Sequence, residues 1–221
     1  MEVARITMFT VATAAGATVV MIVPGLALAW LLARGRFRGH LLLETLVSLP
    51  LVMPPVATGL ILLILCSPRG PVGRILAMAG IEVVFTWKAV LLAMAVMGLP
   101  LFVRTVKAGI EQVDRRYEAA AATLGAAPLR VFLTITLPLA LPSVLAGTML
   151  GFARAIGEFG ATIVIAGSIP GATRTLAVAI YTFTETGRDA DAAVMVGVSA
   201  MIAFGSLWLS NRLTSQSSAR S

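Results

Sequence analysis

Five long apolar stretches alternate with polar segments along the chain, at about residues 8–33, 44–67, 83–104, 139–166 and 191–211. About 20 apolar residues suffice to cross the hydrocarbon core of a bilayer as a helix. The pattern therefore predicts an all-α integral membrane protein with about five transmembrane helices in a single domain, residues 1–221. A secretory signal peptide is the alternative for the first stretch, because Ala27-Leu28-Ala29 has the form of a cleavage box. The apolar stretch is about twice as long as a signal-peptide core, which favours a retained helix.

Prolines interrupt the second stretch at Pro50, Pro54 and Pro55. Proline lacks a backbone N–H and clashes with the preceding helical turn, so we expect this segment to be broken or strongly kinked. Lipid cannot satisfy the carbonyls that a break sets free. The broken half then faces protein or a water-lined path, or it is only an irregularity in a packed helix; the pattern leaves both open.

The longest polar segment, at about residues 105–138, predicts two short helices joined by a turn. Asp114 is a plausible N-cap, and Ala119–Ala122 are strong helix formers. Gly125 supplies a left-handed end, Pro128 suits the start of a second helix, and Leu137-Pro138 is expected to end it and redirect the chain. We call this helix–turn–helix, residues 114–138, the knob. Its alanine surface suits close approach of another protein, with a simple connector as the alternative.

The basic residues indicate how the chain is oriented in the membrane. If the segment 105–138 is cytoplasmic, ten basic residues lie inside and six outside. The positive-inside rule then places the N-terminus outside and the C-terminus inside. The inside set is Arg34, Arg36, Arg38, Arg104, Lys107, Arg115, Arg116, Arg130, Arg212 and Arg220, and the outside set is Arg5, Arg69, Arg74, Lys88, Arg174 and Arg188.

Composition excludes several other classes of protein. Hydrophobic residues make up 58% and charged residues 12%, with a mean hydropathy of +0.96, far from a soluble domain. The net charge of +7 is confined to the gaps between apolar stretches, so no nucleic-acid partner is expected. A single cysteine, Cys66, and a single histidine, His40, argue against a disulfide, a metal cluster or a catalytic constellation. We expect no cofactor and no enzymatic activity.

Two ionisable residues stand inside the fourth stretch. Arg154 and Glu158 are four residues apart, so they share a helix face and can pair. Charged side chains within a membrane are costly and indicate function by default. The spacing leaves two roles open, a structural ion pair or direct contact with a permeating anion.

The knob resembles the EAA signature of ABC importer permeases. Gly125 is followed after nine residues by Ile135-Thr136-Leu137-Pro138, which matches the second half of that signature. In the first half the signature glutamate falls at Ala119, whereas this chain has Glu118 one position earlier. The resemblance assigns ATPase coupling to Glu118, Ala119, Ala120, Ala121, Gly125, Ile135, Leu137 and Pro138.

Three further blocks resemble the molybdate and sulfate permeases of this family. They are residues 49–56, residues 152–162, and residues 169–175 with 179–181, and the last block is closer to the molybdate branch. The resemblance implies the ABC importer permease fold in a bacterial-type inner membrane. It also implies a path or gate that includes Pro50, Pro54, Pro55, Arg154 and Glu158.

The same resemblance implies a set of partners and a substrate. The partners are a second copy of the chain, two cytoplasmic ABC ATPase subunits and an external solute-binding protein. The chain has no Gly-x-x-x-x-Gly-Lys-Ser/Thr phosphate loop, so ATP hydrolysis is expected in another chain. The expected substrate is a tetrahedral oxyanion, molybdate before tungstate or sulfate and thiosulfate. An ion-coupled secondary carrier is the alternative of another class, although no inverted repeat is visible.

Overall fold

The computed structural model describes residues 2–35 and 37–218 of the 221-residue chain. Within these ranges the structure is helical and contains no strand, which confirms the predicted all-α fold. The elements are α1 Glu2–Arg34, α2 His40–Val52, α3 Pro55–Cys66, α4 Pro71–Met78, α5 Trp87–Gln112, α6 Arg115–Thr123, α7 Pro128–Val131, the π-helical turn η1 Phe132–Thr136, α8 Leu137–Ile156, α9 Gly160–Ala166, α10 Leu176–Glu185 and α11 Asp189–Ser218.

The described helices include four that are long and apolar enough to cross a membrane. They are α1, α5, the continuous run from Pro128 to Ile156, and α11. The pair α2 and α3 qualifies as a fifth span, bent by 114° at its middle. This agrees with the prediction of about five spans, and the bend confirms the predicted break at the prolines.

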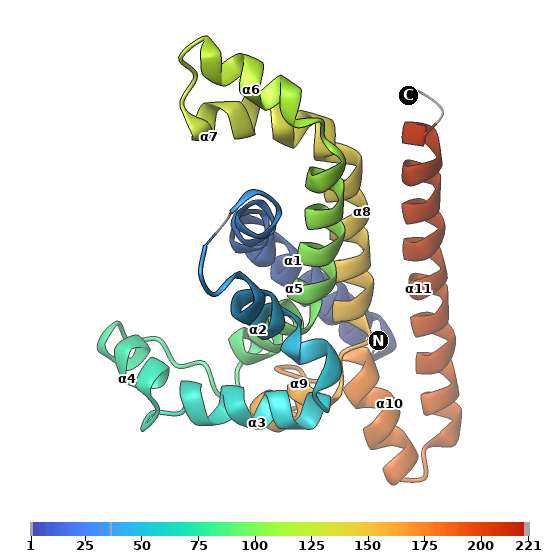
Figure 1. Ribbon diagram of the computed structural model, residues 1–221. Helices are drawn as coiled ribbons and strands as arrows, with labels where there is room; N and C mark the ends of the chain where they lie inside the picture. Colours follow the sequence, from blue (N-terminus) through green and yellow to red (C-terminus); the bar gives the residue numbers. More distant parts are fainter. Residues whose placement is uncertain (1, 36, 219–221) are drawn as a thin grey trace.

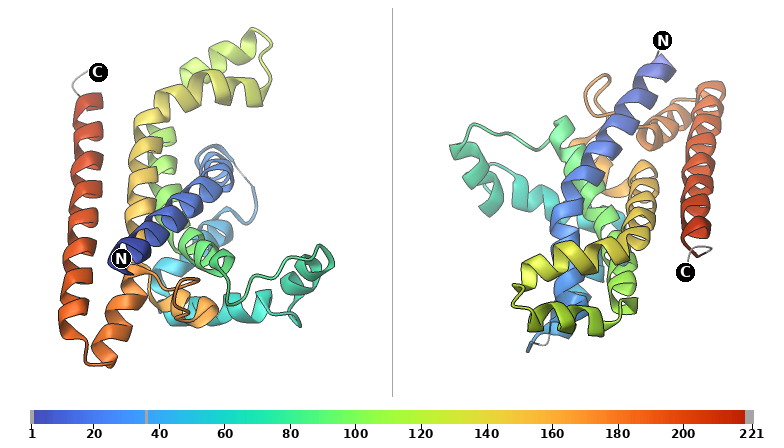
Figure 2. Two further views of the ribbon diagram at one scale, coloured as in Figure 1. Left: turned by 180° about the vertical axis from the view of Figure 1, so that it is seen from behind. Right: turned by 90° about the horizontal axis from the view of Figure 1, so that it is seen from above.

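Helices α1, α5 and α8 pack together and form the centre of the molecule (Figures 1 and 2). Small residues bring their backbones close. A Cβ atom on Gly98 of α5 would lie 2.9 Å from the carbonyl oxygen of Gly151 in α8. A Cβ atom on Gly25 of α1 would overlap the ring of Phe102 in α5. Such close contact is what holds helices together where lipid weakens the hydrophobic drive for association.

The two ends of the molecule are formed by different helices (Figure 1). The knob projects at one end, and the end of α11 lies on the same side, whereas α3, α9 and α10 lie toward the other end. The start of α1 lies near the turn between α10 and α11, because Glu2 pairs with Arg188 at 3.6 Å. The start of α1 therefore lies beside the start of α11, whereas the end of α11 lies on the side of the knob.

The helix of the third predicted stretch, 83–104, differs from that stretch in its bounds. The helix α5 begins only at Trp87, because Thr86 acts as its N-cap and accepts a hydrogen bond from the Lys88 N–H at 3.3 Å. It then continues to Gln112, so eight residues of the predicted polar segment, 105–112, are helical. The first and last helices also extend beyond the predicted 8–33 and 191–211, to 2–34 and 189–218.

The fourth predicted span, 139–166, is not one helix. Helix α8 ends at Ile156, and α9 begins a new helix at Gly160. Gly157 follows α8 directly, and the carboxylate of Glu158 accepts the backbone N–H of Ala161 in the first turn of α9 at 2.7 Å. A glycine that weakens helical continuity and a side chain that caps a new start together explain the break.

The prediction that Leu137-Pro138 ends the second knob helix is wrong. The helix continues from Pro128 to Ile156, although the chain changes direction between α7 and α8 (Figure 1). The Leu137 N–H bonds to the Phe132 oxygen five residues back, in the wide hydrogen-bond ring of a π turn. Pro138 follows at the start of α8 and has no N–H of its own to satisfy. The π turn therefore accommodates Pro138 within a continuous helix, and the helix bends there without ending.

Candidate functional site

The knob forms as its sequence predicts up to Pro128. The Asp114 side chain accepts the Arg116 N–H at 2.9 Å and caps α6. At the other end Gly125 adopts φ +82°, and the Ala126 N–H bonds to the Ala121 oxygen at 3.1 Å. The Gly125 N–H bonds to the Ala122 oxygen, which completes the Schellman form of a helix end. Pro128 then begins α7, so the first part of the knob is a tight turn between α6 and α7.

The knob exposes apolar side chains next to the exposed Arg115, Arg116 and Arg130. Ala119, Ala120 and Ala122 are exposed. Larger apolar side chains surround them, since Leu124 is 89% exposed, Leu129 61% and Tyr117 60%. Exposed apolar surface outside the membrane usually marks contact with another protein. Of the predicted coupling residues, Ile135 and Leu137 are half-buried and Pro138 exposed at the base of the knob, so they form its joint with α8.

Glu118 points the other way. Its carboxylate accepts hydrogen bonds from Arg34 Nε at 3.1 Å and from the Thr136 hydroxyl at 2.6 Å. Arg34 lies at the end of α1 and also donates to the Val113 carbonyl oxygen at 2.9 Å. The contacts with Arg34 and Thr136 cannot be predicted from the sequence, because these residues lie 84 and 18 positions from Glu118 and carry no local signal of the contact.

The broken second span has its corner at Met53-Pro54. Met53 and Pro54 adopt extended backbone angles, and Pro55 begins α3. The freed groups are partly satisfied locally, because the Pro54 oxygen accepts the N–H groups of Ala57 at 2.9 Å and Thr58 at 3.2 Å. Pro50 lies within α2, which continues around it to Val52. Of the three prolines predicted for the path, Pro54 and Pro55 make the corner and Pro50 does not.

The two breaks lie against each other. A Cβ atom on Gly160, the first residue of α9, would lie 2.8 Å from the Pro55 Cβ. A Cβ atom on Gly59 would lie 2.7 Å from the Ala161 Cα, so α3 and α9 touch backbone to backbone. The corner of the second span and the break of the fourth thus form one packed unit.

Arg154 and Glu158 pair as predicted, with Nη2 and Oε2 2.7 Å apart. The Glu158 side chain is 1% exposed, and its other oxygen accepts the Ala161 N–H. The Arg154 side chain is 25% exposed. Both carboxylate oxygens are engaged within the protein, so the geometry favours the structural role of Glu158 over contact with an anion.

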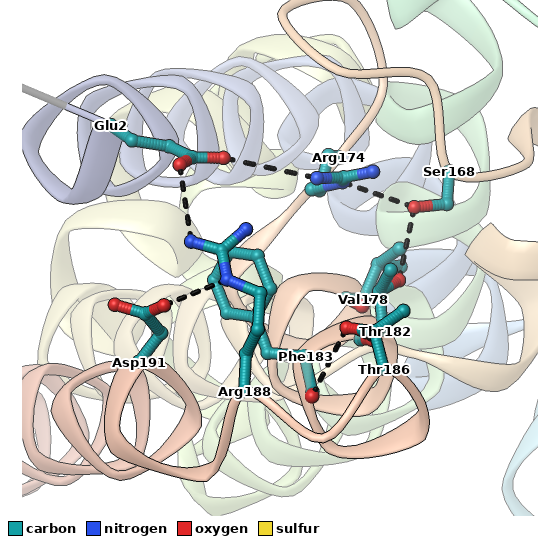
Figure 3. A network of polar contacts seen from close by, with 9 residues as sticks. All are labelled: Glu2, Ser168, Arg174, Val178, Thr182, Phe183, Thr186, Arg188 and Asp191. Carbon is teal, nitrogen blue, oxygen red and sulfur yellow. Dashed lines mark hydrogen bonds and ion pairs between the residues drawn. The ribbon is translucent and has the colours of Figure 1, made fainter.

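A polar network ties the start of α1 to the loop before α10 and to the start of α11 (Figure 3). Glu2 pairs with Arg174 at 3.9 Å and with Arg188 at 3.6 Å, and Arg188 also bonds Asp191 at 2.8 Å. Arg174 Nε donates to the Ser168 hydroxyl at 3.1 Å. The hydrogen bond to Asp191 raises the pKa of Arg188 above its usual value. Arg174 and Arg188 belong to the basic residues counted as external. Neighbouring acidic side chains largely neutralise their charge.

The described parts of the chain contain no group of three or more His, Cys, Asp or Glu side chains that could hold a metal ion. What they contain is a bundle of apolar spans, two helix breaks packed together and a knob with exposed apolar side chains outside the spans. This is the architecture of a membrane transport subunit.

Comparison with known proteins places the chain in a family. Residues 25–211 match the family described as "Binding-protein-dependent transport system inner membrane component", and the chain belongs to it. It is a multi-pass inner-membrane protein and a transport subunit, not an enzyme.

Several characterised relatives are similar over most of the chain. The molybdenum transport system permease protein ModB of Escherichia coli K12 is 47% identical over 86% of this chain and 83% of its own length. ModB of Mycobacterium bovis is 43% identical over 90% of this chain and 76% of its own. The sulfate transport system permease protein CysT of Salmonella typhimurium is 39% identical over 85% of this chain and 69% of its own.

Solved structures share the fold at low sequence identity. A bacterial ABC transporter that imports the polysaccharide alginate aligns with a TM-score of 0.73 at 16% identity, over 96% of this chain and 78% of that chain. The MetNI methionine ABC transporter in an inward-facing conformation aligns with a TM-score of 0.69 at 16% identity, over 96% of both chains. The fold is therefore that of an ABC importer permease, as the sequence resemblance implied.

Proposed function

We propose that this chain is the membrane-spanning permease subunit of an ATP-driven importer of molybdate. The observation that carries the proposal is the 47% identity to a molybdenum permease over 86% of the chain. The sulfate permease is less similar, at 39% over a comparable share. Sulfate or thiosulfate import is the second candidate because of that relative, and tungstate is a third because it is a tetrahedral oxyanion of the same charge.

The proposal includes the partners that such an importer needs. Two cytoplasmic ABC ATPase subunits dock on the knobs of two copies of this chain, and an external solute-binding protein delivers the oxyanion. The apolar tip of the knob, with Leu124 89% exposed, supports a protein partner there. A related alginate transporter was solved in complex with a ligand-bound periplasmic protein, which supports the external partner. In this arrangement the knob and C-terminus face the cytoplasm and the N-terminus faces outside.

The proposal also assigns roles within the membrane. The corner at Pro54 and Pro55, packed on the break at Gly160, is the gate region of the translocation path. The pair Arg154 and Glu158 holds the break of the fourth span in place. The family assignment argues against an ion-coupled secondary carrier, because the family is defined by dependence on a binding protein.

Reconstitution tests the proposal directly. The permease, its cognate ATPase and its binding protein are placed in proteoliposomes, and uptake of labelled molybdate is measured with ATP on the ATPase side. We expect uptake that requires all three components, with tungstate as a strong competitor and sulfate as a weak one. Equal competition by sulfate would favour the sulfate alternative. Uptake without the ATPase would contradict the importer mechanism.

A further inference from the structure

Glu118 occupies an unusual place on the knob. Its carboxylate is turned toward the body of the molecule, and its side chain is 19% exposed. The next residue, Ala119, is exposed and lines the same groove as Glu118 and Arg34. Successive residues of an α-helix are rotated by about 100°. A glutamate one position later would therefore leave α6 in a different direction. In this chain, the side chain at position 118 is the one that meets Arg34.

Three elements meet at this carboxylate. Arg34 comes from the last turn of α1, Glu118 from the first half of α6, and Thr136 from the last residue of the π turn. Next to them the rings of Trp30 in α1 and Phe132 in the π turn lie with centroids 5.0 Å apart. The cytoplasmic end of α1 is thus bound to both helical segments of the knob.

The ion pair of Glu118 and Arg34 is largely shielded from solvent, and both carboxylate oxygens of Glu118 have partners. The Arg34 side chain is 13% exposed, so solvent screens the ion pair little. One Glu118 oxygen accepts from Arg34 and Thr136, and the other lies 3.0 Å from Arg34 Nε. A charge-assisted bond of this kind is strong and directional. Little of the carboxylate remains free for a cation on a docking partner.

We propose that Glu118 is a positioning residue that ties the knob to α1 through Arg34, so that movement of the docked ATPase reaches the transmembrane helices through this ion pair. Docking itself uses the exposed apolar tip of the knob. Without the tie, the knob is joined to the body mainly by its two chain connections, at Val113 and at the π turn. A π turn is a locally weakened helix, so a push on an untied knob would bend this joint instead of moving α1.

The test rests on the proposed importer and uses the complete transporter in proteoliposomes. The variants are Glu118→Gln, Arg34→Gln, Thr136→Val and the charge swap Arg34→Glu with Glu118→Arg. Glu111→Gln, an exposed carboxylate of α5 outside the knob, is the matched control. Each variant is assayed for retention of the ATPase on purification, for ATP hydrolysis stimulated by loaded binding protein, and for molybdate uptake.

We expect Glu118→Gln and Arg34→Gln to retain the ATPase while molybdate taken up per ATP falls by about fivefold or more, the scale of ordinary coupling between sites. The double replacement Arg34→Gln with Glu118→Gln is expected to be no worse than either single one. The charge swap should recover part of the ratio, and Glu111→Gln should keep it unchanged. Thr136→Val removes one bond only and should give a smaller loss.

Retention of the ATPase separates tying from docking. Loss of the ATPase from Glu118→Gln, or an unchanged uptake ratio in both single variants, would each overturn the proposal. A wild-type transporter that takes up no molybdate would instead contradict the proposed function, so the two failures are distinct.

Discussion

At the scale of single residues, Glu158 shows how a buried charge is accommodated within a span. Arg154 neutralises one carboxylate oxygen, and the first turn of α9 donates a backbone N–H to the other. The pair was predictable from the spacing of four residues on an apolar segment. The capping of α9 by Glu158 was not predictable, because it requires the helix break after Ile156. An apolar stretch that contains glycines does not indicate where such a break falls.

Replacing one member of this pair should be worse than replacing both. An uncompensated charge at mid-membrane costs about 2.5–3.5 kcal/mol on insertion scales. We expect Arg154→Ala or Glu158→Ala alone to lower the yield of folded permease, and Arg154→Ala with Glu158→Ala to recover part of it. Size-exclusion recovery and thermal unfolding in detergent measure this. A double variant equal to or worse than the poorer single one would show that the two charges act independently.

At the scale of elements, the knob was predicted well because its signals are local. A capping aspartate, a run of alanines, a left-handed glycine and a helix-starting proline each act within one turn of the chain. The π turn and the contact of Glu118 with Arg34 were missed for the opposite reason. The first depends on how Pro138 fits into a longer helix, and the second joins segments 84 residues apart.

Variants of the knob should separate its folding from its docking. Gly125 adopts φ +82°, which costs a non-glycine residue about 1–2 kcal/mol, so Gly125→Val should loosen the turn. Ala120→Trp adds bulk to an exposed position and should obstruct docking while the knob stays folded. We expect both permeases to reach the membrane and both to lose coupled uptake, with co-purified ATPase as the second measurement. Normal transport in both would remove the coupling role of the knob.

Contact between α3 and α9 can be tested with two glycines. A Cβ atom on Gly59 would lie 2.7 Å and 2.8 Å from backbone atoms of Ala161, so the two helices must separate. We expect Gly59→Ala to destabilise the permease by about 1–3 kcal/mol, as overpacking does. Gly197→Ala is the control, because a Cβ there has open space and improves helix propensity. The midpoint of thermal unfolding should fall for Gly59→Ala and stay unchanged for Gly197→Ala. Equal midpoints for the two variants would show that the contact between α3 and α9 can relax.

At the scale of the whole molecule, the described helices give four apolar spans, or five if the bent pair of α2 and α3 counts as one. The number of spans was readable from hydropathy, because burial in lipid demands long apolar stretches. Which span breaks, and where, depends on contacts between helices. The prolines predicted the corner at Met53-Pro54. No pattern in the sequence predicted that Gly160 packs against Pro55.

The orientation of the molecule can be measured with introduced thiols. Cys66 is 6% exposed and is replaced by serine, and single cysteines are placed at Gln112, Ala126 and Ala190. We expect a membrane-impermeant maleimide to label position 190 in intact cells and positions 112 and 126 only after the membrane is opened. Labelling of 112 or 126 from outside would reverse the proposed orientation.

The contact of the two breaks also has a consequence for how such permeases diverge. Pro55 and Gly160 touch, as do Gly59 and Ala161, and a methyl group added on one side has no room unless the other side recedes. A change at one of these positions should therefore persist in a lineage only after a compensating change at its neighbour. Across related permeases, the side-chain volumes at 55 and 160, and at 59 and 161, should vary together, while those at open positions such as 197 and 205 drift freely.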